Sequence, residues 1–209
     1  LEEKGFEYAY AEVNPFISGK NMGQGIAYSC RLIDQKNCFN EKFNEFLVKK
    51  TSVYMLKPKN YWSLCRFFWS DNAYRLLCFI KYLAAPILNS NNVVPLPKFQ
   101  YPHSAKPNFN SFFIPSGFFD FQTIFPRDTA RQAIKKFLLI GQHYKIYPSL
   151  CSIKRHKSDS SYLSFANDGL SIAWTFSLNG VTPKKRDEYC EKLTDIALAY
   201  NGRTYLAKH

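Results

Sequence analysis

Roughly ninety residues at the carboxyl end of the chain alternate between the two-residue apolar period of strands and the three- to four-residue period of amphipathic helices. The pattern predicts strands at Phe118–Phe125, Ser149–Lys154, Ser171–Leu178 and Arg203–Ala207, with helices at Asp128–Tyr144 and Pro183–Tyr200. Asp128 stands where a residue could cap the first helix. Thr182-Pro183 is typical of a helix start and Asn201-Gly202 of a helix stop.

The order strand, helix, strand, strand, helix, strand predicts an α+β fold. It indicates an antiparallel sheet with helices on one face and a ferredoxin-like β-α-β-β-α-β unit. The opposite face of such a sheet either binds a ligand or packs on the rest of the chain.

The first half of the chain is less regular. Gly5–Val13 and Gly25–Ile33 have strand character and could extend the same sheet. Asn60–Leu88 favours helix and is unusually aromatic, which suits either core packing or a helix on a membrane or partner surface. Asn89–Asn110 is rich in Asn and Pro, and predicts an extended loop.

The composition indicates the cellular compartment and the charge of the partner. Six cysteines without a CxxC pair in 209 residues are typical of reduced thiols in a cytoplasmic protein, and four scattered histidines give no zinc spacing. We see no secretory signal, and Tyr74–Leu88, the most apolar segment, is too short to span a bilayer. A net charge of +12 favours an anionic partner: nucleic acid, a phosphorylated ligand or an acidic lipid surface.

Familiar nucleotide-binding and hydrolase motifs, GxGxxG, GxxxxGK[ST], HExxH and GxSxG, do not occur in the sequence. The terminal segment NGRTYLAKH (Asn201–His209) instead resembles the GGRLYxAKD motif of FAD-linked oxidases. FFDFQTIFP (Phe118–Pro126) resembles the family strand FLQYQFVVP, LCSIKR (Leu150–Arg155) resembles LAVLKRF, and GLSIAWTF (Gly169–Phe176) resembles GWNxCVDF. Tyr8–Gly25 is similar to a family strand followed by GKxLGRG.

These segments occur in the family's order. The chain thus resembles the carboxyl-terminal substrate (cap) domain of the vanillyl-alcohol-oxidase superfamily, most closely the decaprenylphosphoryl-ribose and aldonolactone oxidases. The resemblance implies that residues 1–209 form a cap domain, inactive alone, whose FAD is bound mainly by an amino-terminal domain absent from this chain. It implies hydride transfer to flavin from a sugar, sugar-lactone or polyol hydroxyl.

Carried over by position, the resemblance implies that Lys208 is catalytic and, with Lys154, contacts the cofactor. The substrate-binding positions that it implies are Gln122, Lys154, Asp120, Tyr101, Ser171 and His156. Asp120, Ser171 and His156 replace the family's glutamine, asparagine and aromatic residue, and Ala173 replaces a cysteine of the ribose oxidases. Because of these differences, the resemblance does not identify the substrate.

The expected partners are the FAD-binding domain and a sugar or lipid-linked sugar, with peripheral contact at the inner membrane face also open. The alternative function is a basic ferredoxin-like module that binds nucleic acid or an acidic membrane. Nucleic acid is disfavoured because Ser171–Leu178 lacks the RNP1 pattern of RNA-recognition sheets.

Overall fold

A computed structural model of the chain describes residues 5–33, 66, 70–88, 94, 96–100, 109–162 and 164–208. Its strands are β1 (Tyr8–Val13), β2 (Gly25–Cys30), β3 (Phe118–Pro126), β4 (Pro148–His156), β5 (Gly169–Ser177) and β6 (Arg203–Thr204). Its helices are α3 (Asp71–Leu88), α4 (Leu96–Gln100), α5 (Arg127–Tyr144) and α6 (Pro183–Ala199).

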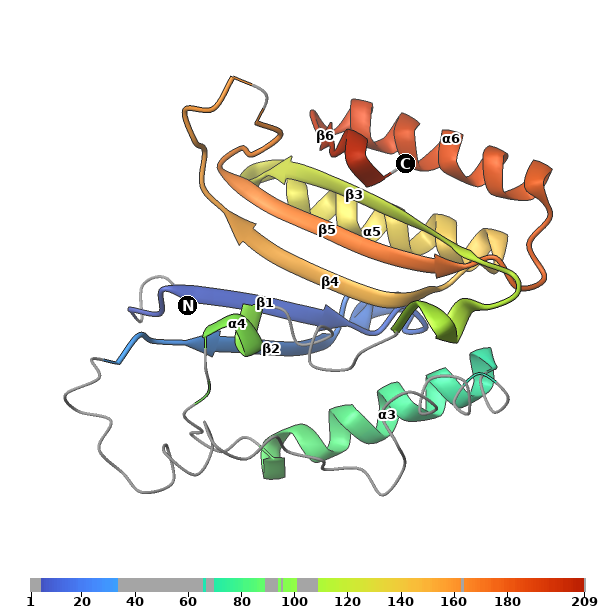
Figure 1. Cartoon of the computed structure of the whole chain (residues 1–209), viewed down its shortest axis with the longest axis horizontal. Coiled ribbons are helices and arrows are strands. Elements are labelled where there is room, and N and C mark those ends of the chain that lie inside the picture. The colour runs from blue at the N-terminus through green and yellow to red at the C-terminus, as the bar shows by residue number, and fades with distance from the viewer. Residues whose placement is uncertain are drawn as a thin grey trace.

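The described strands form one six-stranded antiparallel sheet in the order β2-β1-β4-β5-β3-β6 (Figure 1). Within it, β3-α5-β4-β5-α6-β6 has the strand order of a ferredoxin-like unit, so the predicted α+β fold is confirmed. The β1–β2 hairpin extends the sheet at its β4 edge, where Tyr10 lies opposite Lys154.

Helices α5 and α6 cover one face of the ferredoxin-like unit (Figure 1). Phe137 of α5 is fully buried, and its ring centroid lies 5.7 Å from that of Phe121 on β3 and 5.8 Å from that of Trp174 on β5. Tyr189 of α6 packs edge-on against Phe176 at 5.5 Å. These aromatic contacts hold both helices on the same side, and we call the opposite side the open face.

Helix α3 runs beside β1 and β2 (Figure 1). Tyr74 packs edge-on against Phe16 at 5.5 Å, and burial raises the pKa of the Tyr74 hydroxyl well above its ordinary value. Lys81 forms an ion pair with Glu12 of β1. Because Glu12 precedes the core residue Val13, it belongs to the open face, so α3 borders that face.

Three local predictions are wrong. Strand β6 ends at Thr204 and a 3₁₀ turn, Leu206–Lys208, follows where a longer strand was expected. Leu96–Gln100 is helical inside the predicted extended loop. Pro126, not Asp128, takes the capping position of α5, and the Asp128 carboxylate accepts a bond from the Thr129 amide at 3.0 Å within the first turn.

The ends of α6 match the prediction. Thr182 caps the helix by accepting a hydrogen bond from the Lys185 amide at 3.3 Å. After the helix, Asn201 has a positive φ of 53°, and the Gly202 amide donates to the Ala197 carbonyl at 2.7 Å. This turn aims the terminal segment back along β3.

Among the described helices, none has both the length and the apolar character needed to cross a bilayer. The cysteines that lie in the described ranges, Cys30, Cys78, Cys151 and Cys190, are free thiols.

Gly202 sets how closely the terminal segment approaches the sheet. A Cβ atom there would lie 2.7 Å from the Phe125 ring, which is completely buried, and 2.9 Å from the Thr123 methyl group. We expect Gly202→Ala to lower the free energy of unfolding by about 1–3 kcal/mol, because the ring has no room to move. Urea denaturation measures this loss.

Asn201→Gly is the control. Asn201 is exposed and already has a positive φ, so glycine there should leave the free energy of unfolding unchanged within about 0.5 kcal/mol. Equal stability of the Gly202→Ala and Asn201→Gly variants would contradict the close approach of residue 202 to Phe125.

Candidate functional site

The alternation of side chains along the central strands decides what the open face presents. On β3, Phe121 and Phe125 belong to the core beneath the helices, so Asp120 and Gln122 point the other way. Cross-strand partners share a face, and Asp120 pairs with Thr175 of β5. The same register adds Ser171 from β5 and Lys154 and His156 from β4.

Lys208 reaches this face from the end of the chain. The Tyr205 amide donates to the Gln122 carbonyl at 2.9 Å, and the Lys208 amide donates to the Tyr205 carbonyl at 3.1 Å. This turn brings Lys208 Nζ to 3.8 Å from Asp120 Oδ2. The structure therefore places Lys208 at the site through a turn fixed to β3 and not through a strand.

A hydrogen bond orients the Asp120 carboxylate. Thr175 Oγ1 donates to Asp120 Oδ1 from the directly opposite position on β5. The other carboxylate oxygen, Oδ2, faces Lys208. Both groups are partly exposed, with 25% of the Asp120 side chain and 39% of the Lys208 side chain accessible, so the ion pair contributes little to stability and remains available to a ligand.

Lys154 experiences the charge of Lys208. Burial, and then the positive charge of Lys208, lowers the pKa of the Lys154 ammonium group below its ordinary value. The two groups thus lie on one face and within electrostatic reach of each other. A cation that is partly buried beside another cation is stabilised by an anion bound between or above them.

His156 and Ser171 contribute polar atoms without partners among the described residues. His156 Nε2 and Ser171 Oγ are buried and make no hydrogen bond there. Burial, followed by the charges of Lys154 and Arg155, lowers the pKa of His156. A buried polar atom without a partner carries a free-energy cost that a ligand's polar group can relieve.

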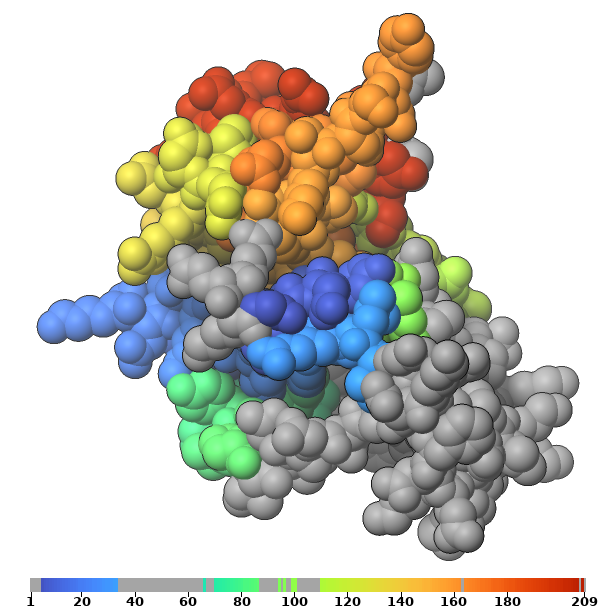
Figure 2. All heavy atoms as spheres, turned by 90° about the vertical axis from the view of Figure 1, so that its left-hand side faces the viewer, coloured from blue at the N-terminus to red at the C-terminus, as the bar shows by residue number. Residues whose placement is uncertain are grey.

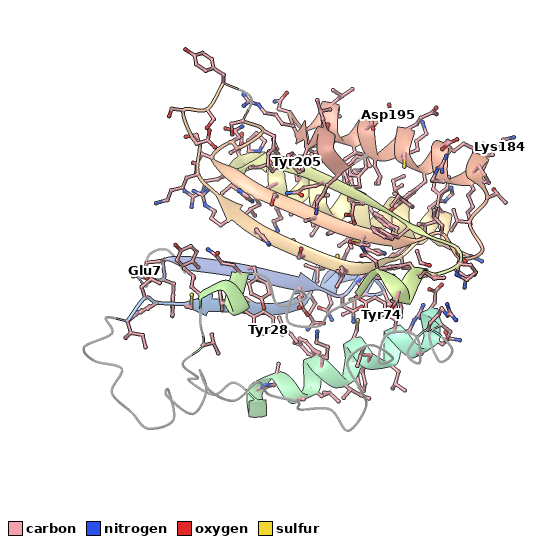
Figure 3. All side chains as sticks on the ribbon, viewed as in Figure 1. Glu7, Tyr28, Tyr74, Lys184, Asp195 and Tyr205 are labelled. Atoms are coloured by element: carbon pink, nitrogen blue, oxygen red, sulfur yellow. The ribbon has the colours of Figure 1, made fainter. Side chains whose placement is uncertain are left out.

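Phe165 and Tyr205 form an aromatic pair at one end of the open face. Phe165, from the loop that joins β4 and β5, lies 5.9 Å from the His156 ring and 4.8 Å from the Tyr205 ring. Figure 3 shows Tyr205 at the β6 end of the sheet. The loop that carries Phe165 projects from the surface, with Tyr162 fully exposed (Figure 2).

The β1–β2 side of the open face is also aromatic. Tyr10 stacks on Tyr28 at 4.8 Å, and Phe99 of α4 meets Tyr10 edge-on at 5.3 Å. Burial, then the nearby Glu12 carboxylate, raises the pKa of Tyr10 far above its ordinary value. In Figure 3, Tyr28 lies between the sheet and α3. Apolar ring surface therefore borders the cationic centre of the open face.

Six of the seven residues singled out from the sequence lie together: Asp120, Gln122, Lys154, His156, Ser171 and Lys208. Tyr101 is outside the described residues. Thr175, Tyr205 and Phe165 also lie at this face but were not predicted from the sequence. Alternation along β5 could have indicated Thr175, and Tyr205 is part of the terminal motif, but no local signal marks Phe165.

No protein-family model matches the sequence, and no curated protein matches it significantly.

The coupling between the two lysines can be measured directly. We expect Lys208→Met to raise the pKa of Lys154, because the substitution removes a neighbouring positive charge. The methionine side chain is similar in length to that of lysine. Carbon-13 NMR of reductively methylated lysines measures this pKa. Lys192→Met is the control, since Lys192 pairs with Asp195 on α6, and an unchanged Lys154 pKa in Lys208→Met would show that the two ammonium groups do not share a face.

His156 makes stability depend on pH with a definite sign. Because its folded-state pKa lies below the ordinary value of 6.5, the unfolded chain binds this proton more readily. The free energy of unfolding should therefore fall as the pH drops below about 6.5, and part of that slope should vanish in His156→Gln. Urea denaturation at a series of pH values tests this, and an identical slope in both proteins would contradict it.

Proposed function

We propose that the chain is the substrate-binding cap domain of an FAD-linked oxidoreductase that oxidises a sugar, sugar-lactone or polyol hydroxyl. The observation that carries the proposal is the gathering of Gln122, Lys154 and Lys208 on the open face of one sheet. The terminal motif and three strand segments that resemble FAD-linked oxidases support the same assignment.

The charges of the open face suit a flavin. Reduced flavin is negative near N1 and C2=O, and a nearby cation stabilises that charge. Lys154 and Lys208 supply two cations beside the carboxylate of Asp120, and a bound anion would offset the desolvation that lowers the Lys154 pKa. Across the intervening β5, side chains on β3 and β4 are two strand spacings apart, about 10 Å, a span that suits a small ring system.

The chain's own residues would bind and orient the substrate. When bound, FAD would accept the hydride from the carbon that carries the hydroxyl group. The Gln122 amide would donate to and accept from sugar hydroxyls, and the Asp120 carboxylate, held by Thr175, would accept a hydroxyl hydrogen bond.

His156 would take up the hydroxyl proton. Its lowered pKa keeps the ring neutral near pH 7, and its Nε2 has no partner among the described residues. In the tautomer that carries hydrogen on Nδ1, this Nε2 accepts a proton. The rings of Phe165 and Tyr205 beside it would exclude water from this end of the site.

The flavin would be held mainly by a separate FAD-binding domain, and the substrate would be a free or lipid-linked sugar. The open face would then form one wall of a site between two domains, where ligand sites are common. This arrangement assigns activity to the assembly and none to the cap domain alone.

A nucleic-acid-binding module receives less support from the same face. Single-stranded RNA binds ferredoxin-like sheets by stacking bases on aromatic side chains of the central strands. The middle parts of β3 and β5 present six side chains there that are not aromatic: Asp120, Gln122, Ile124, Ser171, Ala173 and Thr175. Phe118, at the start of β3, also lies on this face, and its ring packs against that of Phe113 at 4.9 Å.

Flavin binding tests the proposal. We expect the chain, produced together with an FAD-binding domain of this oxidase class, to retain flavin that shows a protein-bound absorption spectrum. Lys208→Met and Lys154→Met should lower the flavin midpoint potential, by about 30 mV for each 1.4 kcal/mol of lost stabilisation. Lys192→Met, on the far side of α6, should leave the potential unchanged.

Two results would refute the assignment. An assembly that retains no flavin would remove the cofactor from the proposal. Equal potentials in the Lys208→Met, Lys154→Met and Lys192→Met proteins would show that the open face does not lie against the flavin.

A further inference from the structure

Helix α3 presents an exposed apolar stripe on the side away from the sheet. Leu76, Phe79, Ile80 and Leu83 follow the spacing of one helical face, and each is 52–58% exposed. The opposite side of the same helix carries Tyr74, which packs on Phe16, and Lys81, which pairs with Glu12. The helix is therefore fixed to the sheet by one side while large apolar groups face outward.

This stripe is too concentrated to be ordinary surface. Single exposed apolar residues are common, but a contiguous patch of several large side chains usually marks a surface that contacts another molecule or a membrane. The described helix has three charged residues, Asp71, Arg75 and Lys81, and none stands among the outward positions. In Figure 2 the helix lies below β1 and β2.

The charge of the chain around α3 indicates which partner suits the stripe. Between Glu45 and Asp120 the sequence contains nine lysines and arginines and one acidic residue, Asp71. Nine basic residues against one acidic residue give +8 of the chain's +12. An apolar helix face within a strongly cationic segment is the combination that binds anionic bilayers, through burial of the face and attraction of the cations.

Aromatic residues precede the helix directly. The sequence Phe67-Phe68-Trp69 ends two residues before Asp71, and tryptophan and tyrosine favour the boundary between lipid headgroups and acyl chains. Arg75 lies at the flank of the stripe, with its guanidinium carbon 5.0 Å from the Phe16 ring centroid. An arginine at the edge of an apolar helix face can contact lipid phosphate groups while the apolar groups enter the membrane.

A second copy of the chain fits this surface less well. It would bring another segment of charge +8 against the first, and like charges oppose such contact. Stable protein interfaces bury about 800 Å² on each partner, whereas one helix of 18 residues, about 27 Å long, offers only a narrow stripe.

We propose that the outward face of α3, formed by Leu76, Phe79, Ile80 and Leu83, docks the protein on an anionic phospholipid bilayer. The helix lies in the interfacial plane, with these side chains among the acyl chains and Arg75 at the phosphate groups. This docking goes beyond the proposed oxidase function and does not depend on it, because it needs neither flavin nor sugar.

Vesicle flotation tests the docking with the full chain. We expect the protein to float with phosphatidylcholine vesicles that contain about 30% phosphatidylglycerol, and to bind pure phosphatidylcholine vesicles at least about tenfold more weakly. Binding should weaken as salt is raised, because salt screens the attraction. Failure to bind the anionic vesicles at low salt would overturn the proposal.

Paired variants locate the contact. Phe79→Ser with Leu83→Ser removes two apolar groups without changing the charge, and should reduce partition into anionic vesicles by about tenfold or more. Leu139→Ser with Leu198→Ser is the matched control, because these residues are 45% and 70% exposed on α5 and α6. Equal binding by the two double variants would overturn the assignment to α3.

A fluorescence measurement covers the case in which the serine variant does not fold. In Phe79→Trp, the emission of the added tryptophan is obtained by subtracting the spectrum of the original protein. This emission should shift to shorter wavelength with anionic vesicles and be quenched by brominated lipid, whereas the emission of the tryptophan added in Leu198→Trp should not change. Light scattering could instead show a dimer that the Phe79→Ser and Leu83→Ser substitutions dissociate and that vesicles do not affect. In that case a second copy of the chain, and not a bilayer, would cover the stripe, and the proposal would be overturned.

Discussion

The aromatic contact between α5 and the central strands determines which side chains the sheet leaves for chemistry. Phe137 sits against both Phe121 and Trp174, and all three are buried. Because neighbouring residues of a strand point to opposite sides, anchoring Phe121 beneath the helix sends Asp120 and Gln122 to the open face. A slip of one residue would exchange these groups with the core, so the aromatic packing also fixes the register of the polar face.

The polar face gathers positive charge in a partly dehydrated setting. Burial lowers the pKa values of both Lys154 and His156, and Lys208 adds a second cation that Asp120 balances only in part. Placing two partly buried cations near one another costs stability, since like charges repel. Perturbed titratable groups that converge on one surface are typical of functional sites. This convergence is our reason for proposing that the open face binds a ligand.

The alternation of periods along the sequence was sufficient to predict the ferredoxin-like unit, because both helices have a clear apolar face and Asn201-Gly202 marks a stop. It did not predict the end of β6. Only two residues of that strand pair with β3, after which the Tyr205 amide bonds to the Gln122 carbonyl and the chain turns. Apolar and polar periods do not encode such a tertiary bond. Phe165 was also missed, since its position depends on a loop that returns to meet His156 and Tyr205.

Helix α3 connects the two surfaces for which we propose functions. Its inner side reaches the open face through the Lys81–Glu12 pair, and Glu12 is two residues from Tyr10, which lies opposite Lys154. Its outer side carries the apolar stripe. A bilayer beneath that stripe would therefore lie beside the β1–β2 margin of the sheet, where Tyr10, Tyr28 and Phe99 supply ring surface. A substrate with a polar head and an apolar tail could then meet both environments without leaving the membrane surface, which would make membrane docking and substrate access consequences of one helix position.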